Sequence, residues 1–281
     1  MAIKLIADSG STKAEWCLLD GKRKKTVFTQ GISPYFLDGE QIKEIVTVGV
    51  KNKLKGIEPL EVYYYGTGCS NVNNAKIVKK ALQKVFPTAV VTVDHDLSGA
   101  AKALCGNEKG VACILGTGSN SCFYNGKRIV KNSPGLGFIL GDEGSGAYLG
   151  KKVIQHYLYN IFDEDLRARF DAKFVTTDTE IIESVYKKPL PNRYLASFAT
   201  FLAENRGHYM IENIIEDGIN DFFYTHIKSY KESQNMPIHF TGGVAYGFRE
   251  VVKQLCLNYD LQPGTFLRSP MEGLIKYHKN K

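Results

Sequence analysis

Short apolar runs in this chain alternate with polar loops that are rich in glycine, serine and threonine. Residues Ile3–Ala7 are apolar, Asp8–Lys13 are mostly polar and small, and Ala14–Leu19 are again mainly apolar. This pattern predicts two strands joined by a tight polar loop. Asp20-Gly21 follows the second run and is a strong turn signal. The chain therefore begins with a predicted β-hairpin.

The same outline returns just over 100 residues later. Val111–Leu115 is a predicted strand, Gly116–Asn120 a polar loop, Ser121–Tyr124 a returning strand and Asn125-Gly126 a turn. A repeat of this length indicates an internal duplication with two similar domains. We expect an N-terminal lobe at residues 1–107 and a C-terminal lobe at residues 108–281. An alternative for the last helix, beyond residue 270, is that it packs back on the N-terminal lobe.

Helical and extended patterns follow one another along the rest of the chain. Strands alternating with helices after each hairpin predict two α/β lobes with a cleft between them. Helical spacing is expected in residues 40–54, 76–86, 97–105, 145–159, most of 163–206, 209–230, 248–259 and the tail beyond 270. Further strands are expected in residues 61–66, 89–96, 236–241 and 263–269.

Composition narrows the class of protein. Of the 281 residues, 43% are hydrophobic and 23% charged, which is typical of a globular protein with a large core. The net charge of +7 comes largely from lysines at turns such as Lys22–Lys25, so it indicates a solvated surface and no nucleic-acid site. The six cysteines show no zinc spacing and favour a reducing compartment. With neither a signal-like start nor a membrane-length apolar run, we expect a cytoplasmic protein without a membrane partner.

The glycine loops are candidate phosphate sites. Glycine at a strand end lets backbone N–H groups approach a ligand, and such loops form nests for phosphate oxygens. Two equivalent loops open the two lobes, and a third, HFTGGVAYG, follows a later strand at residues 239–247. Each loop alone is also compatible with an ordinary turn. The Walker A and dinucleotide-binding patterns are not matched, because Gly144–Lys152 and Gly116–Ser121 both depart from them.

Five segments together resemble a known family. They are DSGSTKAEW (8–16), VDHDLSGAAKAL (93–104), ILGTGSN (114–120), PGLGFILGDEGSGAYLG (134–150) and TGGVAYGF (241–248). In this order they resemble the N-acetylglucosamine kinase group, which belongs with the BadF/BadG-type ATPases in the actin/hexokinase/Hsp70 superfamily. The resemblance runs from residue 3 to about residue 250. It implies an α/β fold with two actin-like (ribonuclease H-like) lobes.

The resemblance also implies a reaction and its nucleotide site. The family transfers the γ-phosphate of ATP to the 6-hydroxyl of an amino sugar with Mg²⁺ as cofactor, and N-acetylglucosamine is the expected sugar. Asp8 is expected to hold Mg²⁺ through water. Residues matching the family's ATP-binding positions are Asp8, Gly10, Ser11, Thr12, Lys13, Gly116, Thr117, Gly242 and Gly243.

The sugar site is implied in the same way, with departures from the family pattern. Residues matching sugar-contacting positions are Ser33, Asp96, Ser119, Asn120, Gly135, Leu136, Gly137 and Asp142. Ser9 and Ser11 stand where the family often has glycine. Ser33 replaces a common asparagine, and Leu136 stands where the mammalian enzymes have tryptophan. The last two departures bear on the identity of the sugar more than on the reaction.

Asp96 is the candidate catalytic base. It follows an apolar strand and precedes a helix of small residues, and a carboxylate there can accept the proton of a sugar hydroxyl. The competing interpretation is that Asp96 caps the helix at 97–105. Asp94 and His95 are alternative bases, and Asp94 shares a face with Asp96 if the strand continues. Asp142, likewise, could instead cap the helix that begins near Ser145.

Two other functions compete with the sugar kinase. A BadF-type ATPase would activate a partner enzyme through nucleotide-driven closure, and it would carry cysteines for an iron–sulfur cluster. A sugar-responsive regulator would need a DNA-binding segment, whereas this sequence opens directly on the first hairpin. The kinase needs only a small-molecule sugar as partner, and a homodimer is left open.

Overall fold

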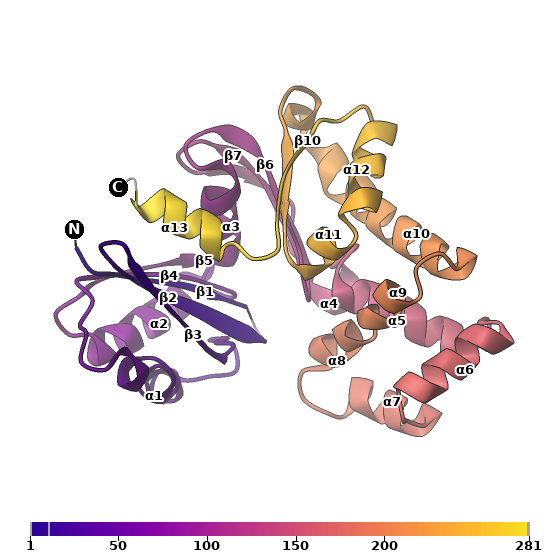
Figure 1. The fold of residues 1–281 in the computed structure, drawn as a ribbon, viewed down its shortest axis with the longest axis horizontal. Coiled ribbons are helices and arrows are strands. Elements are labelled where there is room, and N and C mark those ends of the chain that lie inside the picture. Colours follow the sequence, from indigo (N-terminus) through magenta and orange to yellow (C-terminus); the bar gives the residue numbers. More distant parts are fainter. Residues whose placement is uncertain (1, 11, 280–281) are drawn as a thin grey trace. The chain divides into compact units, whose positions relative to one another are not determined.

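The computed structural model describes residues 2–10 and 12–279 (Figure 1). The chain divides into two compact units. Unit 1 comprises Met1–Glu108, Gly126–Arg128 and Ser269–Lys281, and unit 2 comprises Lys109–Asn125 and Ile129–Arg268. No helix in the described part of the chain is both long and apolar enough to cross a membrane.

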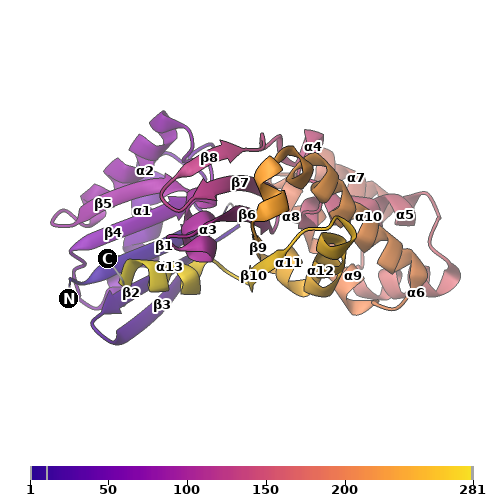
Figure 2. The same cartoon turned by 90° about the horizontal axis from the view of Figure 1, so that it is seen from above.

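Unit 1 is built on a mixed sheet with strand order β3-β2-β1-β4-β5, and Figure 2 shows these five strands side by side. Its strands are β1 (Lys4–Ser9), β2 (Lys13–Asp20), β3 (Arg23–Gln30), β4 (Glu61–Gly66) and β5 (Val90–His95). β1, β2 and β3 form an antiparallel meander, whereas β1, β4 and β5 run parallel. The parallel strands therefore end at one edge of the sheet.

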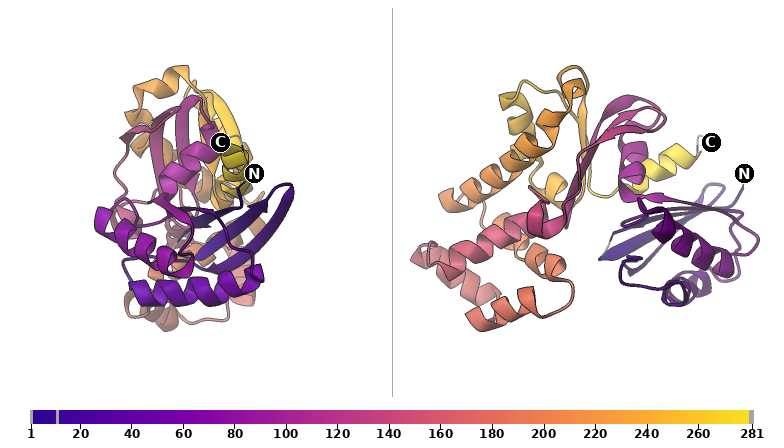
Figure 3. Two further views of the ribbon diagram at one scale, coloured as in Figure 1. Left: turned by 90° about the vertical axis from the view of Figure 1, so that its left-hand side faces the viewer. Right: turned by 180° about the vertical axis from the view of Figure 1, so that it is seen from behind.

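Helices cover both faces of this sheet (Figures 1 and 3). They are α1 (Gly39–Gly49), α2 (Val72–Val85), α3 (Asp96–Cys105) and α13 (Met271–Lys279), with a 3-10 turn η1 (Lys51–Leu54). Alternate strand residues enter different cores, as the period of two requires. Leu5 and Trp16 belong to the core under α1 and α2, whereas Ile6 and Cys17 belong to the core with α13. Asp38 and Asn71 cap α1 and α2.

Unit 2 repeats this topology with the order β10-β9-β6-β7-β8. Its strands are β6 (Lys109–Leu115), β7 (Ser119–Asn125), β8 (Ile129–Asn132), β9 (Ile238–Thr241) and β10 (Pro263–Leu267). β6 pairs antiparallel with β7 and parallel with β9, as β1 does with β2 and β4. Equal strand order and direction in the two sheets match the duplicated outline that the sequence predicts.

The helices of unit 2 share one apolar core with this sheet. They are α4 (Gly137–Leu140), α5 (Gly146–Leu158), α6 (Glu164–Lys173), α7 (Asp178–Tyr186), α8 (Pro191–Ser197), α9 (Ala199–Glu204), α10 (Tyr209–Thr225), α11 (Gly243–Gly247) and α12 (Arg249–Asn258), with 3-10 turns η2 (Ile227–Ser229) and η3 (Lys231–Asn235). The expected long helix at 209–230 ends at Thr225, and after His226 the 3-10 turn η2 begins at Ile227.

Both hairpin loops are shorter than the sequence pattern suggests. Asp8 and Ser9 still pair with Glu15 and Ala14, and Ser119 pairs with Leu115. Asp8, Ser9 and Lys13 were expected in the first loop and Ser119 and Asn120 in the second, but all five lie in strands. The ladder depends on backbone groups, so it continues under polar side chains that the apolar pattern does not count.

A close helix crossing in unit 2 gives a test of the packing. A Cβ at Gly150 of α5 would overlap the carbonyl oxygen of Leu195 in α8, whereas a Cβ at Gly247 of α11 would meet no atom within 4 Å. We expect Gly150→Ala to lower the free energy of unfolding by about 1–3 kcal/mol, because backbone must move. Gly247→Ala should be neutral or stabilise by up to about 1 kcal/mol. Chemical denaturation of both variants measures this, and equal stabilities would contradict the crossing.

Candidate functional site

The polar residues of unit 1 gather where β1, β4 and β5 end. Gly10 and Thr12 form the turn between β1 and β2, closed by a hydrogen bond from Gly10 N to Lys13 O at 3.0 Å. Lys13 is exposed, with its Nζ 3.8 Å from the centre of the Phe28 ring. Ser11, expected to contact ATP, lies outside the described residues. Open α/β sheets bind ligands at this end of their strands.

The segment after β3 is tied to this turn. Ile32 N donates to Ser9 Oγ at 3.2 Å, and Gly31 N donates to Thr12 O at 3.0 Å. These bonds hold Gly31 and Ile32 against the first loop. Buried Ser33, an expected sugar contact, follows them directly in the sequence. The bonds also give Ser9 a task that glycine, common in the family at this position, cannot perform.

Asp8 is a half-buried carboxylate, one residue before the end of β1. Burial, together with the charges of Asp96 and Glu15, raises its pKa to about 7. All three influences act in the same direction, because a low-dielectric site and like charges both disfavour ionisation. The ionised form of Asp8 is therefore disfavoured here, and a bound cation would stabilise it.

Asp96 is the first residue of α3, directly after β5. Its Oδ1 accepts a hydrogen bond from Leu97 N at 2.8 Å. Burial raises the pKa of Asp96, and backbone hydrogen bonds and His95 oppose that rise. The N-cap is His95, which accepts from Ser98 N, so the interpretation of Asp96 as the helix cap is wrong. The helix begins one residue earlier than that interpretation assumed.

Asp94, by contrast, is bound by neighbouring groups of the protein and supports the fold. Its Oδ2 accepts from Ser98 Oγ at 2.6 Å and pairs with Lys102 Nζ at 2.9 Å, while Oδ1 accepts from His95 N. Although burial opposes it, these partners lower the pKa of Asp94. The expected common face of Asp94 and Asp96 does not apply, because the strand ends at His95. Asp94 anchors α3, and Asp96 stands at the helix start.

In unit 2, the second glycine loop joins β6 to β7 and is held by α5. Gly116 N donates to Gly118 O at 3.0 Å. The first amides of α5 donate to the loop, from Gly146 N to Gly116 O at 2.8 Å and from Ala147 N to Thr117 O at 3.0 Å. The motifs GTGSN and GDEGS, over 20 residues apart in sequence, therefore form one structural element.

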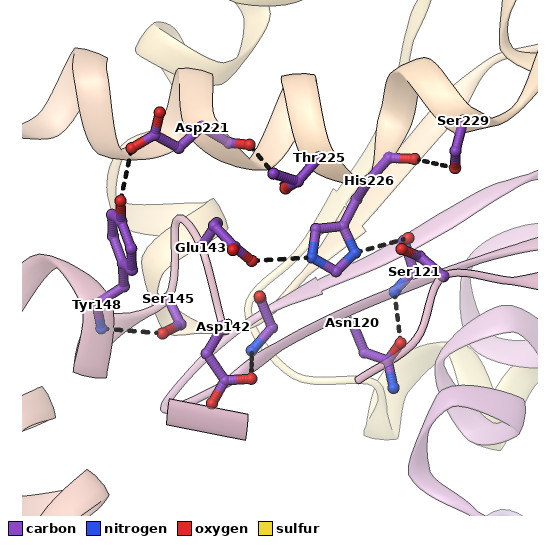
Figure 4. A network of polar contacts seen from close by, with 12 residues as sticks. Asn120, Ser121, Asp142, Glu143, Ser145, Tyr148, Asp221, Thr225, His226 and Ser229 are labelled. Atoms are coloured by element: carbon purple, nitrogen blue, oxygen red, sulfur yellow. Dashed lines mark hydrogen bonds and ion pairs between the residues drawn. The ribbon is translucent and has the colours of Figure 1, made fainter. Parts of the chain in front are cut away.

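Asp142 connects these two motifs through its side chain (Figure 4). Its Oδ1 accepts from Ser119 N at 3.3 Å, and its backbone takes the left-handed φ of 58°. Burial is the main cause that raises the pKa of Asp142. The cap of α5 is Ser145, whose Oγ accepts from Tyr148 N, so the capping interpretation of Asp142 is wrong.

The other proposed sugar contacts lie beside this carboxylate or on the loop before it. Asn120 Oδ1 accepts from Ser121 N at 2.9 Å and from Asn132 Nδ2 at 3.3 Å. A Cβ on Gly135 would lie 3.6 Å from Asn120 Nδ2, an ordinary contact, so the backbone at Gly135 lies close to this amide. Leu136 precedes α4, which begins at Gly137, and is 58% exposed. The segment thus presents an apolar side chain and backbone next to an amide.

The third glycine loop packs directly on the second. Gly242 has a φ of 115°, and a Cβ there would overlap the carbonyl oxygen of Leu115 and lie 3.0 Å from Gly116 N. Gly243 begins α11. The sequence places glycine where both the backbone conformation and the space require it.

One feature is common to all three glycine loops. Thr12, Ser119 and Thr241 each carry a buried side-chain hydroxyl that has no hydrogen-bond partner among the described residues. Buried hydroxyls are nearly always paired, because an unpaired one costs about 1–3 kcal/mol. Their occurrence in each loop indicates that a polar ligand completes them. The sequence pattern did not single out Thr241, although its position before the glycine pair Gly242-Gly243 is a usable signal.

Comparison with known proteins identifies the family of this chain. The model of the BadF/BadG/BcrA/BcrD ATPase family matches residues 7–260. An N-acetylmuramic acid/N-acetylglucosamine kinase of Clostridium acetobutylicum is 24% identical over 238 residues, covering 78% of this chain and 76% of that protein.

Two solved structures share the fold. A candidate N-acetylglucosamine kinase of Porphyromonas gingivalis is 40% identical, with a TM-score of 0.93 and 99% of both chains covered. A ROK family glucokinase of Streptomyces griseus, bound to glucose and AMPPNP, is 15% identical, with a TM-score of 0.57 and coverage of 99% of this chain and 98% of that one. The expected α/β fold of two actin-like lobes is confirmed.

The opposite environments of Asp8 and Asp94 give a test by pH. The pKa of Asp8 lies near 7 in the folded protein against 3.8 otherwise, so its ionisation removes stability as pH rises from about 4 to about 7. Asp8→Asn should therefore stabilise the protein more at pH 8 than at pH 5, by on the order of 2 kcal/mol. Thermal unfolding without ligands measures this.

Asp94→Asn is the matched control. The pKa of Asp94 is lowered, so its stabilising contribution is complete above about pH 4 and lost only at lower pH. We expect this variant to be less stable than the parent by the same amount at pH 5 and pH 8. An Asp8→Asn effect that did not change with pH would contradict the burial of an unbalanced charge.

Proposed function

Because the chain belongs to the BadF/BadG/BcrA/BcrD ATPase family, we propose that it is a sugar kinase, a phosphotransferase with an alcohol acceptor. It transfers the γ-phosphate of ATP to the 6-hydroxyl of an amino sugar, with N-acetylglucosamine as the first choice. The observation that carries the proposal is the unpaired buried hydroxyl in each of the three glycine loops. The likeness to an N-acetylmuramic acid/N-acetylglucosamine kinase and to a candidate N-acetylglucosamine kinase supports it.

The nucleotide is bound by the glycine loops. Gly10, Thr12 and Lys13 of the first loop and Gly116 and Thr117 of the second supply amides, hydroxyls and one exposed ammonium group to the phosphates. Ser11 is included in this proposal on its sequence position alone. Gly242 and Gly243 leave a surface without side chains, which suits contact with the adenosine.

Asp8 is the residue for Mg²⁺. The carboxyl oxygens of half-buried Asp8 are hard donors. The charges of Asp96 and Glu15 add to the effect of burial on its pKa, and Mg²⁺ commonly binds through one or two carboxylates plus phosphates. The residues present therefore fit the ion, with Asp8 acting through water. When bound, Mg²⁺ neutralises charge on the phosphates.

Asp96 accepts the proton in the transfer. The 6-oxygen forms a bond to the γ-phosphorus, the bond from that phosphorus to the bridging oxygen breaks, and ADP leaves with that oxygen. The proton of the 6-hydroxyl passes to the Asp96 carboxylate. Burial raises the pKa of Asp96 toward neutrality, which makes it a better proton acceptor than an exposed aspartate.

The sugar is held mainly by hydroxyl and amide contacts. Asp142, fixed by Ser119 N, accepts from sugar hydroxyls, and Asn120 can donate its amide hydrogens. Ser119, Gly135 and Gly137 provide the remaining polar and backbone groups, and Ser33 is included in this proposal on its sequence position alone. Exposed Leu136 provides an apolar contact suited to the methyl group of an N-acetyl substituent.

A panel of sugars tests the function. We expect ADP release from Mg-ATP to require a hexosamine, because a site built for an alcohol acceptor limits hydrolysis. The panel contains N-acetylglucosamine, N-acetylmuramic acid, N-acetylmannosamine, glucosamine and glucose, each against a control without sugar. Since the family is one of ATPases, steady ADP release without any sugar would instead support an activator of a partner enzyme.

A single substitution tests the base. Asp96→Asn should lose more than tenfold in kcat while nucleotide binding persists, because a positioned base contributes about 10²–10⁴-fold. Asp178→Asn is the matched control, since Asp178 is also the first residue of a helix, α7, but is exposed. Steady-state kinetics and nucleotide titration measure both. An unchanged kcat in Asp96→Asn would remove Asp96 from this role.

A further inference from the structure

Two adjacent acidic residues of unit 2 point in different directions. Asp142 reaches Ser119 N, whereas Glu143 places its Oε2 3.4 Å from His226 Nε2 (Figure 4). The left-handed backbone at Asp142, with φ 58°, allows the two carboxylates to diverge. The proposed sugar contact is therefore joined through its neighbour to the residue that ends α10.

His226 continues into a chain of hydrogen bonds. Its Nδ1 lies 3.3 Å from Ser121 Oγ, and Ser121 Oγ lies 2.9 Å from Tyr230 Oη. Tyr230 Oη also donates to Ser121 O at 2.9 Å and accepts from Ser133 N at 2.7 Å. Glu143, His226, Ser121, Tyr230 and Ser133 form what we call the His226 chain.

The donors in the His226 chain can all point the same way. An ionised Glu143 only accepts, so the hydrogen of neutral His226 belongs on Nε2. Nδ1 is then an acceptor for Ser121 Oγ–H. Tyr230 has one hydroxyl hydrogen, which is directed at Ser121 and shared between its Oγ and its backbone oxygen. Ser133 N–H donates to Tyr230 Oη and begins the chain.

The surroundings of His226 favour this neutral form. Its side chain is 5% exposed and stacks on Phe222 at 4.6 Å between ring centres. Burial lowers the pKa of His226, although Glu143 opposes this. A charged ring would carry hydrogen on both nitrogens, and Ser121 could no longer donate to Nδ1.

Three members of the His226 chain lie next to or near proposed sugar contacts in the sequence. Ser121 follows Asn120, Glu143 follows Asp142, and Ser133 lies two residues before Gly135. These proposed sugar contacts lie on three separate segments of the polypeptide, and the hydrogen bonds of the His226 chain connect all three segments. Buried hydrogen-bond networks of this kind hold one geometry.

We propose that His226 and Tyr230 are positioning residues that hold the segments 119–121, 133–137 and 142–143 in the arrangement that binds the sugar. This inference rests on the proposed function. Neither residue touches the reacting atoms, and both act through Ser121, Ser133 and Glu143. The sugar site therefore includes residues more than 80 positions beyond its contacts in sequence.

Tyr230→Phe is the first test, because it removes one oxygen and keeps the ring. We expect the KM for the sugar that the panel identifies to rise about five- to tenfold, with the KM for ATP changed less than twofold. His226→Phe should give a larger rise in sugar KM. His226→Gln, whose amide can both donate and accept, should recover part of the loss.

Matched controls come from the same unit. Tyr157 is a buried tyrosine whose hydroxyl donates to Asp171 at 2.6 Å, and His208 pairs with Asp163 at 2.9 Å at the opposite end of α10. Tyr157→Phe and His208→Gln remove comparable bonds but should leave both KM values within twofold. Thermal unfolding of all variants separates stability from binding.

The outcomes separate the two proposals. If the parent protein shows no sugar-dependent ADP release, the proposed function fails whatever the variants do. If the parent is active and Tyr230→Phe and His226→Gln lower only the unfolding temperature, the chain is merely structural and the inference is overturned. Equal rises in the KM for sugar and for ATP would overturn it as well. If His226→Phe does not fold, the other two variants decide.

Discussion

Parallel pairing of three strands in each sheet fixes where the polar loops of this protein lie. Because β1, β4 and β5 run in one direction, their carboxyl ends meet at one edge, and β6, β9 and β10 do the same in unit 2. Asp8 and Asp96, far apart in sequence, thereby come close enough for the charge of one to raise the pKa of the other. The pairing of the parallel strands therefore determines where these two groups of polar residues lie.

The sites are formed at a cost to stability. Thr12, Ser119 and Thr241 bury hydroxyls without partners, and Asp8 is a carboxylate that burial and like charges oppose. By contrast, Asp94 and Ser145, which lie next to these groups, are fully engaged in anchoring α3 and capping α5. Other groups proposed to meet a ligand, Asp96, Asn120 and Asp142, each accept a hydrogen bond from the chain and keep further acceptor or donor capacity for the ligand.

Sequence patterns predicted most elements because apolar periodicity reports burial directly. They missed β8, whose residues Ile129–Asn132 are mostly exposed and show no alternation. At β5 and α3 they left Asp94, His95 and Asp96 as alternatives, since three polar residues at a strand–helix boundary look alike without their partners. The family motifs pointed to Asp142 and Asn120. The link from Glu143 to His226 spans 83 residues and depends on tertiary packing, so no local pattern contains it.

The path of the chain has a consequence for how the protein is made. Most of unit 1 precedes unit 2 in the sequence, yet α13, which follows β10, packs against α3 and supplies Met271, Leu274 and Ile275 to one core of unit 1. During synthesis, the face of the first sheet that carries Ile6 and Cys17 is covered only in part, by α3, until α13 emerges from the ribosome after almost all of unit 2. A chain truncated before α13 would therefore leave part of this apolar face open to aggregation.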